Sequence, residues 1–100
     1  MKDVVALGEL LIDFAPVSRD EAGYPTLKAQ PGGAPGNFLA ALQKYGCSTA
    51  LIGKVGADSF GKLLLATVAA KGIETRGIVS DPDAFTTLAF VTLDLSLIHI

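Results

Sequence analysis

The stretch STALIGKVGADSFGKLLLATVAAKGI, residues 48–73, contains one complete strand-to-helix unit. Its first part, residues 48–55, is rich in β-branched and apolar side chains, a composition typical of a buried strand. Asp58 or Ser59 can cap the helix that follows, because either side chain can accept a hydrogen bond from a free N–H of the first turn. Apolar residues then recur at helical spacing until Gly72, which predicts that the helix ends there.

The beginning of the chain is predicted to form another buried strand. Residues 4–7 and 10–14 make an apolar run that is interrupted by Gly8 and Glu9. Such a run is too short for a bundle helix and is typical of a strand that leads into a loop. We therefore expect Asp13 to lie at the carboxyl end of a strand.

The next segment, residues 15–31, is predicted to be mainly loop. It contains three prolines, a glycine and several charges, all of which punctuate regular structure. We expect no more than a short edge strand around residues 24–29. Behind Gly32 and Gly33, apolar residues recur at helical spacing until Gly46, so a short helix is expected to end at that glycine.

Two further strands are expected near the end of the chain, at residues 73–79 and 86–93. In the second of them Phe90 falls on the opposite face from Ala89, because successive side chains of a strand alternate. The alternation of strands and helices along the whole chain predicts an α/β fold built on a doubly wound parallel sheet. We find no internal repeat and no boundary of a second domain.

Composition restricts the class of protein. The chain has 100 residues, half of them hydrophobic, and a net charge of -2. It has no basic stripe that could follow nucleic acid, and its N-terminus fits neither a signal peptide nor a membrane span, so we expect a cytoplasmic protein. Cys47 is the only cysteine, which excludes an internal disulfide. His99 has no second ligand at metal spacing, and we expect no metal site.

The motif PGGAPGN, residues 31–37, is the most informative for binding. Two adjacent glycines let a ligand approach the backbone closely, and the start of the helix behind them presents free N–H groups. Asn37 adds an amide that can both donate to and accept from a hydroxyl. Asp13, an acceptor when ionised, suits sugar hydroxyls better than a phosphate. Spacing alone leaves open whether the motif binds a ligand or is only a glycine-rich turn before a helix.

The motif GADSFGK, residues 56–62, has the glycine and lysine spacing of a phosphate-binding P-loop. Leu63 stands where that loop needs a Ser or Thr hydroxyl for Mg²⁺. The dinucleotide fingerprint G-x-G-x-x-G is also missing from the sequence. We therefore interpret this stretch as the entry and cap of a helix.

Together, Gly8, Asp13, the GGAPGN loop, Gly46 and the motif IGKVGADSFG at residues 52–61 closely resemble the first signature region of the ribokinase, or PfkB, carbohydrate kinases. The segment DPDAFTTLAFVTLD, residues 81–94, is most similar to the fructokinases within that family. The resemblance covers residues 3–94. It implies the N-terminal portion of a ribokinase-like sheet with β-lid strands.

Carried over position by position, the resemblance implies a sugar site. Asp13 and Asn37 match the family's ligands of sugar hydroxyls, and Gly32 and Gly33 match the glycines whose backbone borders the sugar. Gly36 stands where the family more often has alanine.

The resemblance also implies a lid over the sugar. Residues 15–29 and 87–93 correspond to the family's β-lid, which often supports a homodimer. Ala89 and Phe90 would be the lid residues nearest to the sugar.

The implied reaction is transfer of the γ-phosphoryl group of ATP, with Mg²⁺, to a sugar. The leading expectation is D-fructose, giving fructose 6-phosphate; the alternatives are 2-keto-3-deoxygluconate, ribose, or a non-catalytic sugar-binding module. The family's Gly-Ala-Gly-Asp loop, which carries the catalytic base, does not occur in these residues. We therefore assign no catalytic and no ATP-binding residue to this chain and expect it to be inactive alone. Residues 95–100, LSLIHI, depart from the family where a polar turn is expected, and we treat them as a tail of doubtful origin.

Overall fold

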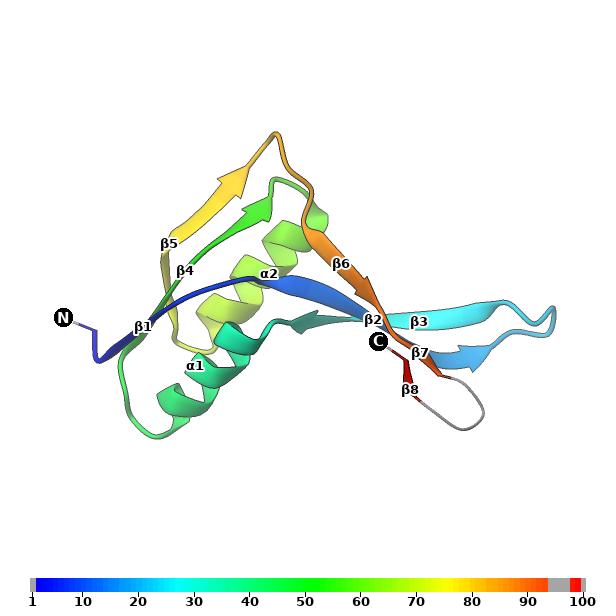
Figure 1. The fold of residues 1–100 in the computed structure, drawn as a ribbon, viewed down its shortest axis with the longest axis horizontal. Helices are drawn as coiled ribbons and strands as arrows, with labels where there is room; N and C mark the ends of the chain where they lie inside the picture. The colour runs from blue at the N-terminus through cyan, green and yellow to red at the C-terminus, as the bar shows by residue number, and fades with distance from the viewer. Residues whose placement is uncertain (1, 94–97, 100) are drawn as a thin grey trace.

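The computed structural model describes residues 2–93 and 98–99, which form two three-stranded sheets, two helices and a short hairpin (Figure 1). In chain order the elements are β1 (Val4–Leu7), β2 (Leu11–Arg19), β3 (Pro25–Gly32), α1 (Ala34–Lys44), β4 (Thr49–Gly56), α2 (Ser59–Ala70), β5 (Glu74–Asp81), β6 (Thr87–Phe90), β7 (Thr92–Leu93) and β8 (Ile98–His99). The sequence predicted both helices, and it placed β4 and β5 to within two residues.

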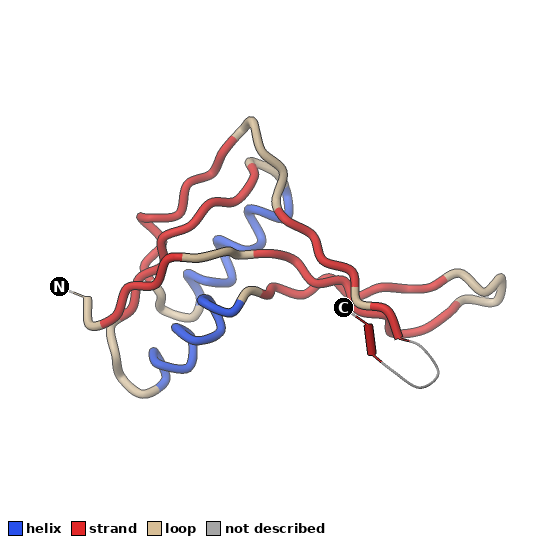
Figure 2. Tube along the Cα trace, viewed as in Figure 1, coloured by secondary structure: helices blue, strands red, loops and turns tan. Residues whose placement is uncertain are grey.

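The first sheet has the order β1-β4-β5, and all of its pairs are parallel. This confirms the expected α/β fold. Both helices lie on the same side of this sheet (Figure 2), where their apolar faces meet it in one core. The core side chains are Leu10, Ile12, Leu39, Leu51, Val55, Leu64, Val68, Ile73 and Ile78.

The ends of both helices follow the local signals in the sequence. Asp58 caps α2, and its side chain accepts a hydrogen bond from the N–H of Gly61 at 2.7 Å. Gly46 and Gly72 follow α1 and α2 with φ of 90° and 84°, a conformation that favours glycine after a helix. None of the described helices is long and apolar enough to cross a membrane.

The other face of the parallel sheet carries apolar side chains that no described element covers. Leu7 pairs with Ile52 in the parallel register, and Val5 and Val79 lie on the same face by strand alternation. These side chains are 78%, 45%, 53% and 58% exposed, respectively. Parallel sheets are normally covered on both faces, so this open face is unusual for a stable isolated domain.

The second sheet has the order β3-β2-β6 and contains a long hairpin that extends away from the helices (Figure 1). Here the expectation of a loop was wrong for residues 15–19, because β2 continues to Arg19, whereas the edge strand expected around residues 24–29 is confirmed as part of the longer β3. The turn between them is held by Asp20, which accepts hydrogen bonds from the N–H groups of Ala22 and Tyr24.

The prolines occupy positions in this sheet that tolerate them. Pro25 is the first residue of β3, and Pro31 lies on β3 as well, which is an edge strand with a single neighbour. Pro16 lies beyond residues 11–14, the part of β2 that pairs with β6, and next to a register shift. None of the three therefore removes an N–H from a strand with two partners at that point.

The end of the chain is described only in part. β6 ends at Phe90, earlier than expected, and Thr92–Leu93 pairs antiparallel with Ile98–His99. Residues 94–97 and 100 lie outside the described residues. The doubtful origin of residues 95–100 therefore stays a prediction.

Candidate functional site

Asp13 lies inside a strand of the second sheet, not at the end of the first. β1 stops at Leu7, and after the break at residues 8–10 the chain enters β2, where Asp13 is the third residue. The expectation that it ends a strand was wrong, because one apolar run supplies two strands of different sheets. In the register, Asp13 lies beside Gln30 of β3 and Ala89 of β6.

Gly32 brings the glycine loop against this carboxylate. A Cβ atom added to Gly32 would collide with Oδ2 of Asp13 and lie 3.0 Å from its Cγ. Gly32 is itself buried. The absence of a side chain at this position is therefore what allows the Asp13 carboxylate to lie directly over the backbone that leads into α1.

Gly33 has a different reason to be glycine. Its φ is 112°, and a Cβ atom here would collide with the backbone carbonyl of Glu9. It is the N-cap residue of α1, and within the described residues no side chain caps this helix. N–H groups of the first turn are therefore available to a ligand that accepts hydrogen bonds.

Asn37 lies one helical turn further on, where its N–H donates to the carbonyl of Gly33 at 3.2 Å. It is exposed and shares a small cleft of about 40 Å³ with Gly32 and Gly36. The structure thus connects Asp13 to Gly32 by direct contact and Asn37 to Gly32 through this cleft.

The two lid residues predicted to approach the sugar lie on opposite faces of their sheet. Ala89 is beside Asp13 and shares its face, whereas Phe90 pairs with Phe14 on the other face. The rings of Phe90 and Phe14 stack with centroids 5.0 Å apart, and Phe14 also meets Phe60 of α2 edge-on at 5.6 Å. The structure therefore groups Ala89 with the candidate site and separates Phe90 from it.

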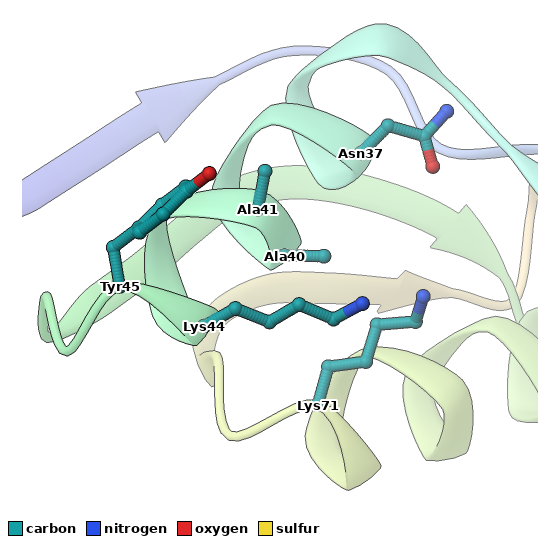
Figure 3. Close-up of a pocket in the computed structure, with 6 residues that line it drawn as sticks. All are labelled: Asn37, Ala40, Ala41, Lys44, Tyr45 and Lys71. Carbon is teal, nitrogen blue, oxygen red and sulfur yellow. The ribbon is translucent and has the colours of Figure 1, made fainter.

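Two grooves lie away from Asp13. One of about 560 Å³ lies between α1 and the end of α2 (Figure 3); its lining residues are Asn37, Ala40, Ala41, Lys44, Tyr45 and Lys71. Another of about 560 Å³ lies on the lid and includes Phe90 and Val91. Asn37 is the single predicted sugar ligand that lines the first groove. Asp13 itself lines neither of these grooves.

A set of polar contacts near the site was not expected from the sequence. The Asp58 carboxylate, beyond capping α2, accepts hydrogen bonds from the N–H and the hydroxyl of Thr86 at 3.0 and 2.7 Å. These bonds hold the pKa of Asp58 below its ordinary value of 3.8, with the backbone N–H of Thr86 as the largest cause. The partners are 28 residues apart, so no local sequence signal could have paired them.

Comparison with known proteins agrees with the resemblance seen in the motifs. Residues 1–96 match the pfkB family carbohydrate kinases. A fructokinase from Zea mays, "Fructokinase-1", is 46% identical over 94 residues, which are 90% of this chain and 28% of that protein. The chain therefore spans less than a third of the length of this curated relative.

Solved structures give the same result for the fold. A fructokinase from Xylella fastidiosa superposes with a TM-score of 0.85 at 35% identity, over 91% of this chain and 28% of that one. An uncharacterized sugar kinase from Pyrococcus horikoshii, solved in complex with ATP, superposes with a TM-score of 0.84 at 35% identity, over 95% of this chain and 32% of that one. Because the family match covers nearly all of its residues, this chain belongs to the pfkB family of carbohydrate kinases.

Proposed function

We propose that this chain is the sugar-binding part of an ATP-dependent kinase that phosphorylates D-fructose to fructose 6-phosphate. The observation that carries the proposal is the Asp13 carboxylate lying over the Gly32 backbone at the entrance to α1. The choice of fructose is supported by the names of similar proteins, several of which are called fructokinase.

Each group at the site has a role that its chemistry allows. The Asp13 carboxylate accepts hydrogen bonds from two sugar hydroxyls and would repel a phosphate group. N–H groups at the start of α1 donate to sugar oxygens, and the Asn37 amide can do either. Ala89, beside Asp13, offers a small apolar surface for the sugar ring. Such contacts fix the orientation of the hydroxyl that is to be phosphorylated, which is a large part of catalysis in this class of reaction.

ATP is the proposed phosphoryl donor, and Mg²⁺ its proposed companion. The donor is supported by two similar structures that contain ATP, from Pyrococcus horikoshii and Xylella fastidiosa. When bound, ATP would supply the transferred phosphoryl group, and Mg²⁺ would neutralise its charge. Among the described residues there is no group of three or more His, Cys, Asp or Glu side chains that could hold a metal ion. Because the family's Gly-Ala-Gly-Asp loop does not occur in this sequence, we assign neither ligand to residues of this chain and place the catalytic base in sequence that the longer relatives have.

We also propose that a second copy of the protein docks on the lid. The lid groove is lined by Pro16, Val17, Ser18, Arg19, Pro25, Leu27, Phe90 and Val91. Val17 and Phe90 are more than half exposed, and Phe90 lies on the face opposite Asp13. An exposed apolar surface of this kind is often an interface between copies of a chain in symmetric dimers.

The proposed function is tested by steady-state kinetics on the protein that carries this sequence, with fructose, ribose and 2-keto-3-deoxygluconate as substrates. Asp13→Asn should raise KM for fructose and lower kcat while leaving KM for ATP unchanged, because it removes an acceptor of sugar hydroxyls. Glu21→Gln is the matched control, since it removes an exposed carboxylate at the tip of the same hairpin. Fructose binding without turnover would support a non-catalytic module instead, and unchanged fructose kinetics in Asp13→Asn would remove Asp13 from the site.

A further inference from the structure

The hydrogen bonds around Asp58 join three separate segments of the chain. Oδ1 accepts from the N–H of Gly61 at 2.7 Å and from the hydroxyl of Thr86 at 2.7 Å, and Oδ2 accepts from the N–H of Thr86 at 3.0 Å. The Thr86 hydroxyl oxygen accepts in turn from the N–H of Gly56 at 3.0 Å. The end of β4, the start of α2 and the residue before β6 are thereby tied together. We call these four residues, Gly56, Asp58, Gly61 and Thr86, the Asp58 clasp.

Capping of α2 alone does not explain this arrangement. A cap needs a single acceptor for one N–H of the first turn, which a serine also provides. Asp58 has a second carboxylate oxygen and uses it for the backbone of Thr86, 28 residues away. Thr86 is buried, with 5% of its surface exposed, so its N–H and its hydroxyl both need partners inside the protein.

The two glycines of the clasp are explained by the same contacts. A Cβ atom at Gly56 would lie 2.5 Å from Oδ2 of Asp58 and 2.6 Å from the nitrogen of Thr86. A Cβ atom at Gly61 would collide with the carbonyl of Gly56 and lie 3.1 Å from the Thr86 hydroxyl. The glycine spacing of GADSFGK, which imitates a phosphate-binding loop, therefore serves to let these segments approach one another.

The Asp58 clasp lies at the start of β6, the strand of the lid that reaches the candidate site. Thr86 immediately precedes β6, and three residues later Ala89 lies beside Asp13. At about 3.3 Å per residue, the clasp is about 10 Å from that pair along the strand. A shift of β6 by one residue would put Leu88 or Phe90 beside Asp13 in place of Ala89, because the register decides which residues of two strands lie opposite each other.

From these contacts we infer that Asp58 is a positioning residue, which through Thr86 anchors β6 and sets the register that brings Ala89 beside Asp13. It acts on sugar binding through the lid strand and does not touch the sugar. The consequence for sugar binding rests on the proposed function, whereas the anchoring of β6 does not. Ionisation supports the role, because a carboxylate is a stronger acceptor than its protonated form.

The inference is tested by amide hydrogen exchange on the protein that carries this sequence, together with fructose kinetics. Asp58→Ser keeps one capping oxygen for Gly61 but loses the second acceptor. Thr86→Val removes the hydroxyl, and Thr86→Ser restores it. We expect the amides of β6 to exchange about tenfold faster or more in Asp58→Ser and Thr86→Val, because losing a bond to a charged group changes an opening equilibrium by about that factor. Exchange in Thr86→Ser should stay close to wild type.

The amides of α1 and of β4, leaving out Gly56 because its N–H donates to the Thr86 hydroxyl, provide the comparison that separates positioning from general stability. The inference predicts that their exchange changes little while that of β6 increases, and that KM for fructose rises with KM for ATP unchanged. Equal acceleration in α1, β4 and β6 would show a merely structural role and overturn the inference, as would unchanged exchange in β6. If the wild-type protein does not phosphorylate fructose at all, the proposed function fails, while the exchange of β6 still decides whether the clasp anchors the strand.

Discussion

Replacing Gly32 by alanine should weaken sugar binding more than it weakens the fold. The added Cβ would occupy the space of the Asp13 carboxylate and lie 3.0 Å from Cδ1 of Leu11. The carboxylate is the far end of a side chain and can rotate away, at a cost of about 0.5–1.5 kcal/mol if it leaves a staggered rotamer. The sugar then loses at least one hydrogen bond to a charged group, worth about 1.5–3 kcal/mol. This corresponds to about a tenfold to hundredfold loss of affinity.

The assay is calorimetric titration of fructose into wild type and Gly32→Ala, with the midpoint of thermal unfolding measured on the same samples. Gly33→Ala should weaken the fold more than it weakens fructose binding, because the φ of Gly33 is 112° and the added Cβ would collide with the backbone carbonyl of Glu9, which no side-chain rotation can relieve. Its backbone conformation, with φ of 112° and ψ of 125°, is rare for residues with a side chain and alone costs about 1–3 kcal/mol. Gly23→Ala is the control, since its φ is 86° but its Cβ would meet nothing within 4 Å. Wild-type affinity in Gly32→Ala would refute the role given to the contact between Gly32 and Asp13.

Three further results are expected. Leu39→Ala should lower the free energy of unfolding by about 2–5 kcal/mol in urea titrations, because this side chain of α1 has no exposed surface; a loss under 1 kcal/mol would mean that the helix is not packed as described. Hydrogen bonds from Thr86 lower the pKa of Asp58 in the folded state. The ionised Asp58 therefore stabilises the fold at pH above its ordinary pKa of 3.8, and this stabilisation is lost as pH falls through the lower pKa of the folded state. Between these two pKa values, the free energy of unfolding of Thr86→Val should depend less steeply on pH than that of wild type, and an identical pH profile would contradict the assignment. Leu7→Lys should reduce aggregation of this 100-residue polypeptide, measured by light scattering, and should lower the free energy of unfolding by no more than about 0.5 kcal/mol, because Leu7 is 78% exposed on the open sheet face. Leu51→Lys is the contrasting variant, and it should unfold the polypeptide because the Leu51 side chain has no exposed surface.

The parts of the fold that the sequence predicted are those with local signals. The unit from residue 48 to residue 73 has a β-branched strand, a capping carboxylate and a terminal glycine, and each acts within a few residues. The structure places Asp58 and Gly72 in the expected roles. Of the hairpin of β2 and β3, the sequence predicted only a short edge strand around residues 24–29, because these strands are stabilised by pairing with each other and with β6, which lies more than 50 residues later. Its prolines are tolerated because Pro25 and Pro31 lie on the edge strand β3 and Pro16 lies beyond the part of β2 that pairs with β6.

In the candidate site too, the residues with a local sequence signal were predicted and the contacts between distant segments were not. Asp13, Gly32 and Gly33 were found from residue type and motif, and the structure adds the contact between Asp13 and Gly32. Phe90 was included with Ala89 by resemblance, although strand alternation already placed the two on opposite faces, as the structure now shows. The bonds between Asp58 and Thr86 depend on three-dimensional closeness alone.

A crystal structure of the protein that carries this sequence, grown with fructose, tests the central claim most directly. We predict sugar hydroxyl oxygens about 2.5–3.0 Å from the Asp13 carboxylate, the usual range for such bonds, with the ring against the Gly32–Gly33 backbone and Ala89 on the lid side. Fructose bound elsewhere, for example in the groove between Lys44 and Lys71, with no contact to Asp13, would contradict the account.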